Sequence, residues 1–476
     1  MKNQRRWGEV IRVAAATTAA CAALSMTAPI AQAQSGAMAS IAGPVAVTAQ
    51  SGEPYRGANE QPVAGPGLPI PALAPFGYVE EEYFVSGAVD GKPYKTSLLV
   101  RKPKDPAKFS GLAVVETIHA QGAIPMWGFR EVWMPNGHAW VAIGSQLSAL
   151  ETHVKKSNPT RYSDLQIPKA EAAAGPSASN PMAGGAQDLI SQAILTQVGA
   201  LLKSNAKNGP LSGMNVRYLI MGGSSQTGGT TLRYIESSHA KARMPNGKPI
   251  YDGYLPMEAF SSTPIQGGDA AVMHPVGEGD LMVFSGSGRP MAQRADGDAP
   301  NDRYRHYQFA GAAHVVTRGI TNPEVVFPTL KGVLKPGEQL SQFPCAELYR
   351  AAAIHLIAWV TKGVAPPKGA RIEIANGAIA RDEFGNAKGG IRSPYVDVPT
   401  VRYIASAPAT DSSNMFRRLI GLEEPIPKEK LRALYKSKEE YLSRFNKGID
   451  RMVAERWLMP ADGDKLKKEE AEHAPL

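Results

Sequence analysis

The fold of this chain is decided by residues 216–239, which read VRYLIMGGSSQTGGTTLRYIESSH. The apolar run Tyr218–Met221 predicts a buried strand, and Leu232 and Ile235 continue at helical spacing. Only small or polar residues occupy 222–229, between the two. A strand, a sharp turn and a helix with serine at the apex are the layout of a nucleophile elbow, which holds the serine hydroxyl clear of a sheet.

The crowding of such a turn indicates which serine is the nucleophile. The positions two before and two after the nucleophile must be small. With Ser225 as nucleophile they are Gly223 and Thr227, whereas Ser224 would place the bulky Gln226 there. We therefore predict Ser225. A Gly/Ser-rich turn after a strand is common in α/β proteins, so the prediction depends on support from the rest of the chain.

Residues 1–33 have the features of a secretory signal. Three basic residues near the N-terminus precede the apolar, Ala-rich segment Val13–Pro29, and Ala31-Gln32-Ala33 forms a small-x-small cleavage site before Gln34. We expect cleavage there and a periplasmic or secreted mature protein.

Composition excludes several classes of protein. Loss of four cations and one anion with the signal lowers the net charge from +9 to near +6, and no Lys/Arg-rich run is interleaved with aromatics, so no nucleic-acid partner is expected. No later run is long and apolar enough to span a bilayer. Cys345 is the one cysteine outside the signal, so we expect a buried thiol and no intramolecular disulfide.

The remaining chain is predicted to comprise a Pro/Gly-rich arm at 34–75, an α/β domain at 76–407 and a helical C-terminal extension at 408–476 with a charged tail. Regular structure is expected from Tyr78. Strands are predicted at 78–85, 96–100, 112–118, 138–143, 218–221, 250–257, 281–285 and 304–309, and helices at 188–202 and 341–360, in addition to the helix that leaves the elbow. Strands alternating with helices predict a mostly parallel, doubly wound sheet with helices on both faces.

His314 is the best candidate for the base that activates the serine. In the elbow fold the order along the chain is serine, acid, histidine. His314 follows the predicted strand 304–309 and a small-residue turn, which places it at the carboxyl edge of the sheet, where ligands bind. His239 would face away on the elbow helix, His355 lies in an apolar helix and His473 lies in the charged tail.

The elbow Gly-Ser-Ser-Gln-Thr-Gly resembles the Gly-x-Ser-Gln-(Ser/Thr)-Gly of a bacterial α/β-hydrolase-domain family whose substrates are mostly unassigned. Other segments that resemble this family are YVEEEYFVSG at 78–87, GHAWV at 137–141, DLISQA at 188–193, RADGDAP at 294–300, AGAAH at 310–314 and GAIARD at 377–382. The resemblance implies an α/β-hydrolase fold, with Ser225 as nucleophile and His314 as base.

The acid of the triad is where the chain departs from the family. The family tends to carry a carboxylate near the position of residues 285–288, which read SGSG here. Asp298, in the next loop, is the favoured acid, and Glu258, at the end of the predicted strand 250–257, is its rival. Asp280 and Asp302 rank lower, because Asp280 precedes a predicted strand and Asp302 lies in a turn that leads into one.

Two backbone N–H groups are expected to form the oxyanion hole. One is that of Gln226, directly after the nucleophile, at the N-terminus of the elbow helix. By its position in the loop 119–122, Ala120 is the second, and His119 is then a pocket residue. The aromatic residues that follow could wall an acyl pocket or belong to the core; they are Trp127, Phe129 and Trp133.

The sequence therefore predicts an exported serine hydrolase, most simply of a small carboxylic ester, that needs no cofactor. It has no His-Glu-x-x-His zinc motif, no complete dinucleotide fingerprint and no phosphate loop. An amidase or acyltransferase is possible within the same chemistry. The missing carboxylate near 285–288 keeps open a non-catalytic binding protein on a hydrolase scaffold. Nothing in the sequence indicates the oligomeric state.

Overall fold

In a computed structural model of the protein, residues Ala37–Leu476 form one compact unit. The signal predicted at 1–33 lies outside the described residues. The structure describes residues 40–44, 53–58, 73–171, 185–283, 291–318, 332–408 and 415–475.

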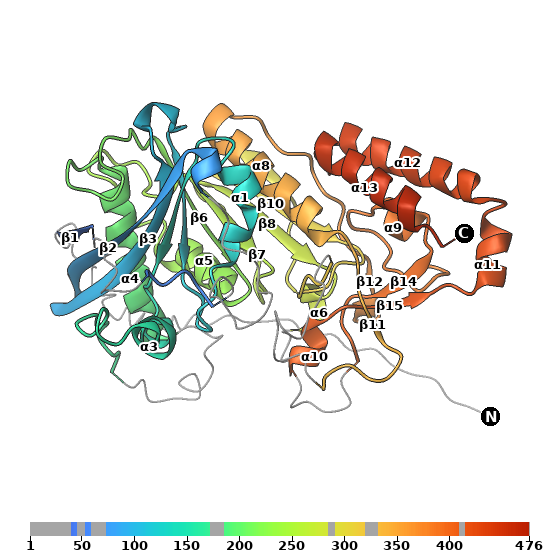
Figure 1. Cartoon of the computed structure of the whole chain (residues 1–476), viewed down its shortest axis with the longest axis horizontal. Coiled ribbons are helices and arrows are strands. Elements are labelled where there is room, and N and C mark those ends of the chain that lie inside the picture. Colours follow the sequence, from blue (N-terminus) through green and yellow to red (C-terminus); the bar gives the residue numbers. More distant parts are fainter. Residues whose placement is uncertain are drawn as a thin grey trace, which may run out of the picture. The chain divides into compact units, whose positions relative to one another are not determined.

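A ten-stranded sheet forms the centre of this unit, in the order β1-β2-β3-β5-β4-β6-β7-β8-β10-β9 (Figure 1). Six neighbouring strands of this order, β5, β4, β6, β7, β8 and β10, are mutually parallel. The remaining strands, β1, β2, β3 and β9, pair antiparallel with their neighbours. This confirms the predicted α/β-hydrolase fold. The strands are β1 (Ser40–Pro44), β2 (Tyr78–Val89), β3 (Lys92–Pro103), β4 (Leu112–Thr117), β5 (Ala139–Ile143), β6 (Tyr218–Ser224), β7 (Gly253–Met257), β8 (Ala271–Gly277), β9 (Gly297–Ala299) and β10 (Asp302–Phe309).

Local sequence explains the clearest of these elements. Asp90 and Gly91 both have positive φ, 50° and 75°, as the two-residue turn between β2 and β3 requires, so the predicted hairpin is confirmed. All residues of β4 and β5 are buried, as expected of strands covered on both faces.

Three long helices pack on the sheet. Helix α4 (Ala186–Lys203) contacts β2 and β6, and α5 (Gln226–Ser237) contacts β6 and β7. Helix α8 (Cys345–Lys362) contacts β7, β8 and β10. All three were predicted, because each has apolar residues at helical spacing. The bounds predicted for α4 and α8 lie within about four residues of those observed.

One predicted strand was misplaced, with consequences for the site. The strand expected at 281–285 is instead β8, at Ala271–Gly277, and Asp280–Val283 form the short helix α6. Pro275 lies inside β8 and cannot donate a ladder hydrogen bond, which disguises the strand in the sequence. Residues 284 and 285 lie outside the described part of the chain.

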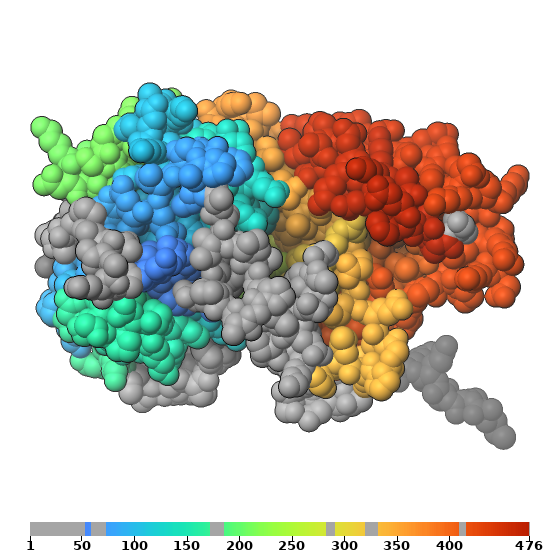
Figure 2. Space-filling model, in the orientation of Figure 1, coloured from blue at the N-terminus to red at the C-terminus, as the bar shows by residue number. Residues whose placement is uncertain are grey.

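Regular structure also begins earlier than the expected Tyr78, since β1 pairs antiparallel with β2. Towards the C-terminus, α12 and α13 lie side by side (Figure 1). The C-terminal part of the chain, orange to red in Figure 2, covers one continuous area of the surface in this view. The helical C-terminal region is thus confirmed, but the expected charged tail belongs to α13. The described helices of this region are α10 (Met415–Leu419), α11 (Lys428–Leu434), α12 (Lys438–Ala454) and α13 (Pro460–His473), and α9 (Pro394–Asp397) precedes it.

Several shorter elements complete the description. The shorter helices are α1 (Arg130–Trp133), α2 (Leu147–Ala149) and α3 (Lys155–Ser157), and the short strands are β11 (Gln339–Leu340), β12 (Ile374–Ala375), β13 (Ala378–Ile379), β14 (Val401–Ile404) and β15 (Leu422–Pro425). Within the described ranges, no helix combines the length and apolar character needed to cross a membrane.

Candidate active site

Ser225 stands at the sharp turn between β6 and α5. Its φ of 57° and ψ of −119° are unusual for a residue with a side chain, and such a conformation costs about 1–3 kcal/mol. The Ser225 N–H donates to the Met257 carbonyl at 3.0 Å, which ties the turn to the end of β7. The predicted elbow geometry is therefore present, with Ser225 at its apex.

Close packing explains two of the elbow's glycines. A Cβ on Gly223 would lie 2.4 Å from the carbonyl carbon of Thr227, and a Cβ on Gly228 would lie 2.4 Å from the Met257 oxygen. Thr227, two positions after Ser225, fits in the turn, where its hydroxyl accepts the Ser224 N–H at 2.9 Å. The second position that must be glycine is one residue later, at Gly228.

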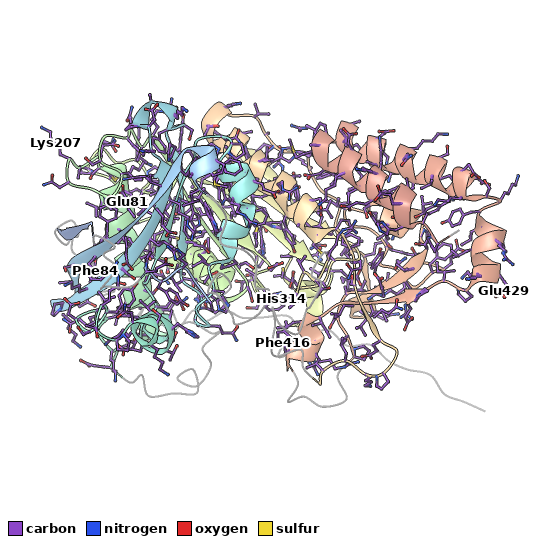
Figure 3. All side chains as sticks on the ribbon, in the orientation of Figure 1. Glu81, Phe84, Lys207, His314, Phe416 and Glu429 are labelled. Carbon is purple, nitrogen blue, oxygen red and sulfur yellow. The ribbon has the colours of Figure 1, made fainter. Side chains whose placement is uncertain are left out.

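A continuous hydrogen-bonded chain links Ser225, His314 and Asp280. The Ser225 Oγ lies 2.9 Å from His314 Nε2, and His314 Nδ1 lies 2.5 Å from Asp280 Oδ1. Asp280 is fully buried, and its Oδ2 accepts the Gly277 N–H at 2.7 Å. A carboxylate only accepts, so the imidazole proton lies on Nδ1 and Nε2 is left to accept the serine proton. Figure 3 shows His314 beyond the carboxyl end of β10.

The electrostatics of this chain suit a base. Burial alone lowers the pKa of His314, but the charge and hydrogen bond of Asp280, together with the charge of Glu258, raise this pKa above its ordinary value. Because the protonated imidazole is the charged form, the same carboxylates stabilise it when it takes a proton.

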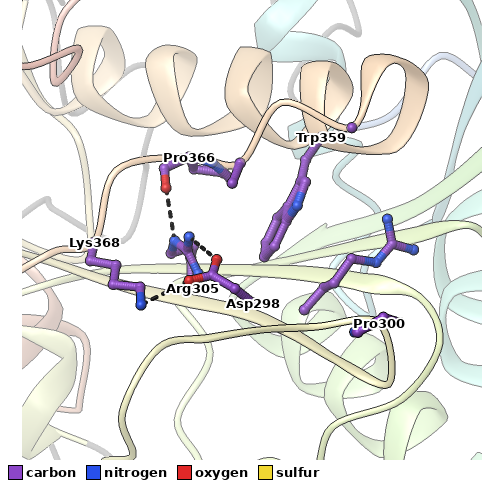
Figure 4. Close-up of a pocket in the computed structure, with 9 residues that line it drawn as sticks. Asp298, Pro300, Arg305, Trp359, Pro366 and Lys368 are labelled. Atoms are coloured by element: carbon purple, nitrogen blue, oxygen red, sulfur yellow. Dashed lines mark hydrogen bonds and ion pairs between the residues drawn. The ribbon is translucent and has the colours of Figure 1, made fainter.

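Asp298, the favoured acid in the sequence analysis, lies elsewhere, so that expectation is wrong. Its carboxylate pairs with Arg305 at 2.5 Å and with Lys368 at 2.8 Å, and its side chain is 45% exposed (Figure 4). The hydrogen bonds from these two cations lower the pKa of Asp298. It contributes to the wall of an open pocket of about 610 Å³, in which its carboxylate is already paired with Arg305 and Lys368.

The misplaced strand explains why Asp280 ranks low from the sequence alone. With a strand expected at 281–285, Asp280 seemed to precede the sheet. With β8 ending at Gly277, it lies just past the carboxyl end of a strand, where a triad acid belongs. The signal that could have found it was the apolar run around Pro275.

Glu258, the rival acid, lies behind the elbow. It is 8% exposed with a φ of 52°, and its Oε2 accepts a hydrogen bond from the Ser224 hydroxyl. Burial raises the pKa of Glu258 to about 7; the charge of His314 and the hydrogen bond from Ser224 lower this pKa, and the charge of Asp280 raises it. The structure thus gives the Nδ1 position to Asp280 and leaves Glu258 as a second carboxylate near the imidazole.

A buried brace joins the loops that carry Asp280 and His314. Glu278, only 1% exposed, accepts the Gly311 N–H at 2.8 Å and pairs with Arg381. Glu278 stands two residues before the acid, and Gly311 stands in the turn that leads to the histidine. Arg381 belongs to the GAIARD segment at 377–382, to which the sequence analysis assigned no role.

The residues that carry the two expected oxyanion donors contact each other through the Gln226 side chain. Gln226 is the first residue of α5, so its N–H has no partner within the helix. The Ala120 N–H donates to the Gln226 side-chain oxygen at 3.2 Å, at the long end of the ordinary range. The Gln226 side-chain amide is in turn held by Gln146 through two hydrogen bonds of 2.7 and 3.0 Å.

The neighbouring residues divide between the site and the core. Burial lowers the pKa of His119 to about 4, helped by the charges of His314 and His153, so His119 is neutral near the site. Trp127 and Trp133 are 0% and 1% exposed, which places them in the core and not on a pocket wall.

Other histidines form a buried chain. His274 Nε2 lies 2.7 Å from the Ala259 carbonyl, which can only accept, and its Nδ1 lies 3.0 Å from His306 Nδ1. The side-chain nitrogen of Gln308 lies 2.7 Å from His306 Nε2. This pattern is satisfied with both imidazoles neutral, and burial lowers the pKa of each. In the described part of the chain, no group of three His, Cys, Asp or Glu side chains could hold a metal ion.

Comparisons with known proteins place this geometry in a family. A family model described as an alpha/beta hydrolase domain matches residues 41–468. No curated protein matches the chain. Similar solved structures are the esterase Est22 (13% identity, 40% of this chain and 46% of that chain, TM-score 0.23), a thermostable esterase from Pseudomonas putida (12%, 40% and 46%, 0.24) and the siderophore hydrolase EstA from Aspergillus nidulans (15%, 48% and 76%, 0.27).

The match covers less than half the length of the first two esterases. The family model, in contrast, extends from β1 into α13 and so includes the sheet, the elbow and the loops that carry His314 and Asp280. This chain belongs to the alpha/beta hydrolase domain family.

Proposed function

We propose that this protein is an exported serine hydrolase that cleaves carboxylic esters, with Ser225 as nucleophile, His314 as base and Asp280 as acid. The observation that carries the proposal is the unbroken hydrogen-bonded chain from the Asp280 carboxylate through the imidazole to the Ser225 hydroxyl. A serine hydroxyl is a weak nucleophile until a positioned base takes its proton.

In the proposed first half-reaction, Ser225 Oγ attacks the ester carbonyl while His314 Nε2 takes the hydroxyl proton. The resulting imidazolium donates that proton to the leaving alkoxide, so an alcohol departs and an acyl-serine remains. Water then attacks the acyl carbon and gives a proton to the same nitrogen. The imidazolium returns this proton to Ser225 Oγ as the bond between Oγ and the acyl carbon breaks, which releases the carboxylic acid and restores the serine. Asp280 keeps the imidazole in the required tautomer and stabilises its charge in both halves.

The negative oxygen of each tetrahedral intermediate is assigned to the N–H groups of Gln226 and Ala120. The first has no partner within its helix, because Gln226 is the first residue of α5. The second must be shared with, or released by, the side-chain oxygen of Gln226, to which it donates at 3.2 Å. Removal of one oxyanion donor typically costs about 100- to 1,000-fold in kcat.

The rival proposal, a non-catalytic binding protein, depended on the absence of a carboxylate near residues 285–288. Asp280 contacts His314 from a position a few residues earlier, so this reason for the rival is lost. An amidase or acyltransferase would use the same three residues and differs only in the substrate or acceptor.

Export is proposed from the sequence of residues 1–33, which has a basic start, an apolar segment and a cleavage site. N-terminal sequencing of protein from its native host should begin near Gln34. A chain that still begins at Met1 would contradict export.

Labelling by a fluorophosphonate probe tests the activated serine. The wild-type mature protein should label covalently and Ser225→Ala should not, while a panel of esters, lactones and amides should show fastest turnover of an ester. An intact, folded wild-type protein that neither labels nor hydrolyses any member of the panel would reject the proposed function. Faster cleavage of amides would move the assignment to an amidase.

A further inference from the structure

Residues 53–58 precede the first long strand of the sheet, in a segment that the sequence analysis treated as an arm. We infer that these residues, called the strap below, hold the loop 119–123 in place, and that Tyr55 is a positioning residue for the oxyanion donor in that loop. The inference rests on the proposed function, because it takes the Ala120 N–H as that donor.

The strap binds the loop through a single carbonyl group. The Tyr55 hydroxyl donates to the Gly122 oxygen at 2.6 Å, and the Ala58 N–H donates to the same oxygen at 2.8 Å. Gly122 has a φ of +83°, and a Cβ there would lie 2.3 Å from the Tyr55 oxygen and 2.7 Å from the His153 ring. The strap therefore approaches the loop so closely that only glycine fits between them.

The strap is itself anchored on β2. Tyr55 is 6% exposed, and its N–H donates to the Tyr162 hydroxyl at 2.8 Å, which in turn donates to Glu82 at 2.8 Å. The Arg56 side chain donates to Glu80 at 2.8 Å. Two carboxylates of one strand thus fix the strap on both sides of Tyr55, and the strap can transmit the rigidity of the sheet to the loop.

The other side of the loop rests on the elbow. The loop closes on itself through the Gly122 N–H, which donates to the His119 carbonyl at 2.7 Å. The Ala120 N–H then reaches the Gln226 side chain. The loop is thus held between the strap at Gly122 and the elbow at Ala120. Loss of the Tyr55 hydroxyl removes the shorter of the two strap bonds to the loop, two residues from the proposed donor.

An oxyanion donor contributes only if it is already in place when charge develops on the substrate oxygen. A strap that sets the position of the loop should therefore affect the catalytic constant more than substrate binding. Substitution of a residue that merely adds stability would change the melting temperature without lowering kcat relative to KM.

The test is Tyr55→Phe in the mature protein, with Tyr78→Phe as the matched control. Tyr78 is 5% exposed, and its hydroxyl donates to the backbone carbonyls of His138 at 2.9 Å and Trp133 at 3.2 Å. Both substitutions remove one buried tyrosine hydroxyl that binds backbone oxygen. Of these two hydroxyl groups, only that of Tyr55 donates to the loop 119–123.

We expect Tyr55→Phe to lower kcat by about tenfold with KM changed by less than about twofold, and to weaken binding of a trifluoromethyl ketone in proportion. Hydrogen–deuterium exchange should become faster in a peptide that covers 119–123. Tyr78→Phe should leave kcat, binding of the ketone and hydrogen exchange at 119–123 unchanged. Both variants should melt slightly below the wild type.

Hydrogen exchange separates failure of this inference from failure of the proposed function, because exchange requires no turnover. Unchanged exchange at 119–123 in Tyr55→Phe overturns the inference, whatever the activity. Faster exchange with an unchanged kcat overturns the role of the loop as a donor. If the wild type hydrolyses nothing but the loop exchanges faster in Tyr55→Phe, the strap is supported and the proposed function is rejected.

Discussion

Replacement of Asp280 by asparagine should nearly abolish turnover, because it should force His314 into the wrong tautomer. In the wild type, Asp280 Oδ2 accepts the Gly277 N–H at 2.7 Å and Oδ1 faces His314 Nδ1 at 2.5 Å. An asparagine has one oxygen, which the Gly277 N–H requires, so its NH₂ group would face Nδ1. Nδ1 would then have to accept, and the proton would move to Nε2, opposite the Ser225 hydroxyl.

The size of the loss follows from the role of Nε2. When Nε2 carries the proton of the neutral imidazole, it cannot accept the serine proton. Neutralising a triad carboxylate with intact geometry lowers kcat on the order of ten-thousand-fold in serine proteases. That factor corresponds to about 5 kcal/mol of transition-state stabilisation. Because Asp280 is fully buried, it cannot touch the substrate, and KM should change little.

Hydrolysis of a p-nitrophenyl ester by purified mature protein measures this effect, with Asp298→Asn as the control. Asp298 is 45% exposed and paired with Arg305 and Lys368, so its variant should keep kcat within about twofold of the wild type. The reasoning is refuted if Asp280→Asn loses less than about tenfold, roughly 1.4 kcal/mol, or if the control loses more than Asp280→Asn. A circular dichroism spectrum and melting curve exclude unfolding as the cause.

Three further outcomes are expected. Ser225→Ala should abolish fluorophosphonate labelling without lowering the melting temperature, whereas Ser224→Ala should still label; loss of labelling in Ser224→Ala alone would place the nucleophile there. Glu258→Gln should move the acid limb of the pH profile of kcat/KM to lower pH, since activity falls as His314 protonates and ionised Glu258, whose own pKa is about 7, raises the pKa of His314; an unmoved limb would contradict this. The melting temperature should fall as the pH drops from about 6.5 towards 4, because burial lowers the pKa of His274 to about 4 in the folded state while histidine in the unfolded chain takes a proton near pH 6.5; a flat profile would contradict neutral buried imidazoles.

The parts of the fold that could be predicted from the sequence are those whose cause is local. The elbow is read from one stretch, because the strand, the small residues and the helix follow one another directly. His314 was found for the same reason: it follows a clear strand and a turn of small residues. In both cases the sequence neighbours of a residue decide where its side chain lies.

The acid could not be ranked correctly because its position depends on where a strand ends. Pro275 argues against a strand by the usual rule, yet β8 contains it: the Pro275 carbonyl accepts the Glu258 N–H at 3.0 Å. The shift of the strand boundary turned Asp280 from a residue before a strand into one after it. Local pattern gives no measure of such a boundary.

Other features of the site depend on contacts between distant parts of the chain. Tyr55 meets Gly122, 67 residues away, and Arg381 meets Glu278 across 103 residues. Each side chain alone looks like an ordinary surface tyrosine or arginine in a loop. Only the folded chain brings these partners together, so no single-sequence pattern could indicate them.

The two outer strands of the large sheet have a consequence for the behaviour of the protein in solution. Both are short: β1 has five residues and β9 has three, and each covers part of a longer neighbour, β2 with twelve residues and β10 with eight. A long uncovered strand offers its free N–H and C=O groups to other chains and promotes aggregation. A protein shortened to begin after Pro44 would uncover part of the backbone edge of β2 and should be more prone to self-association, although none of the proposed triad would be missing.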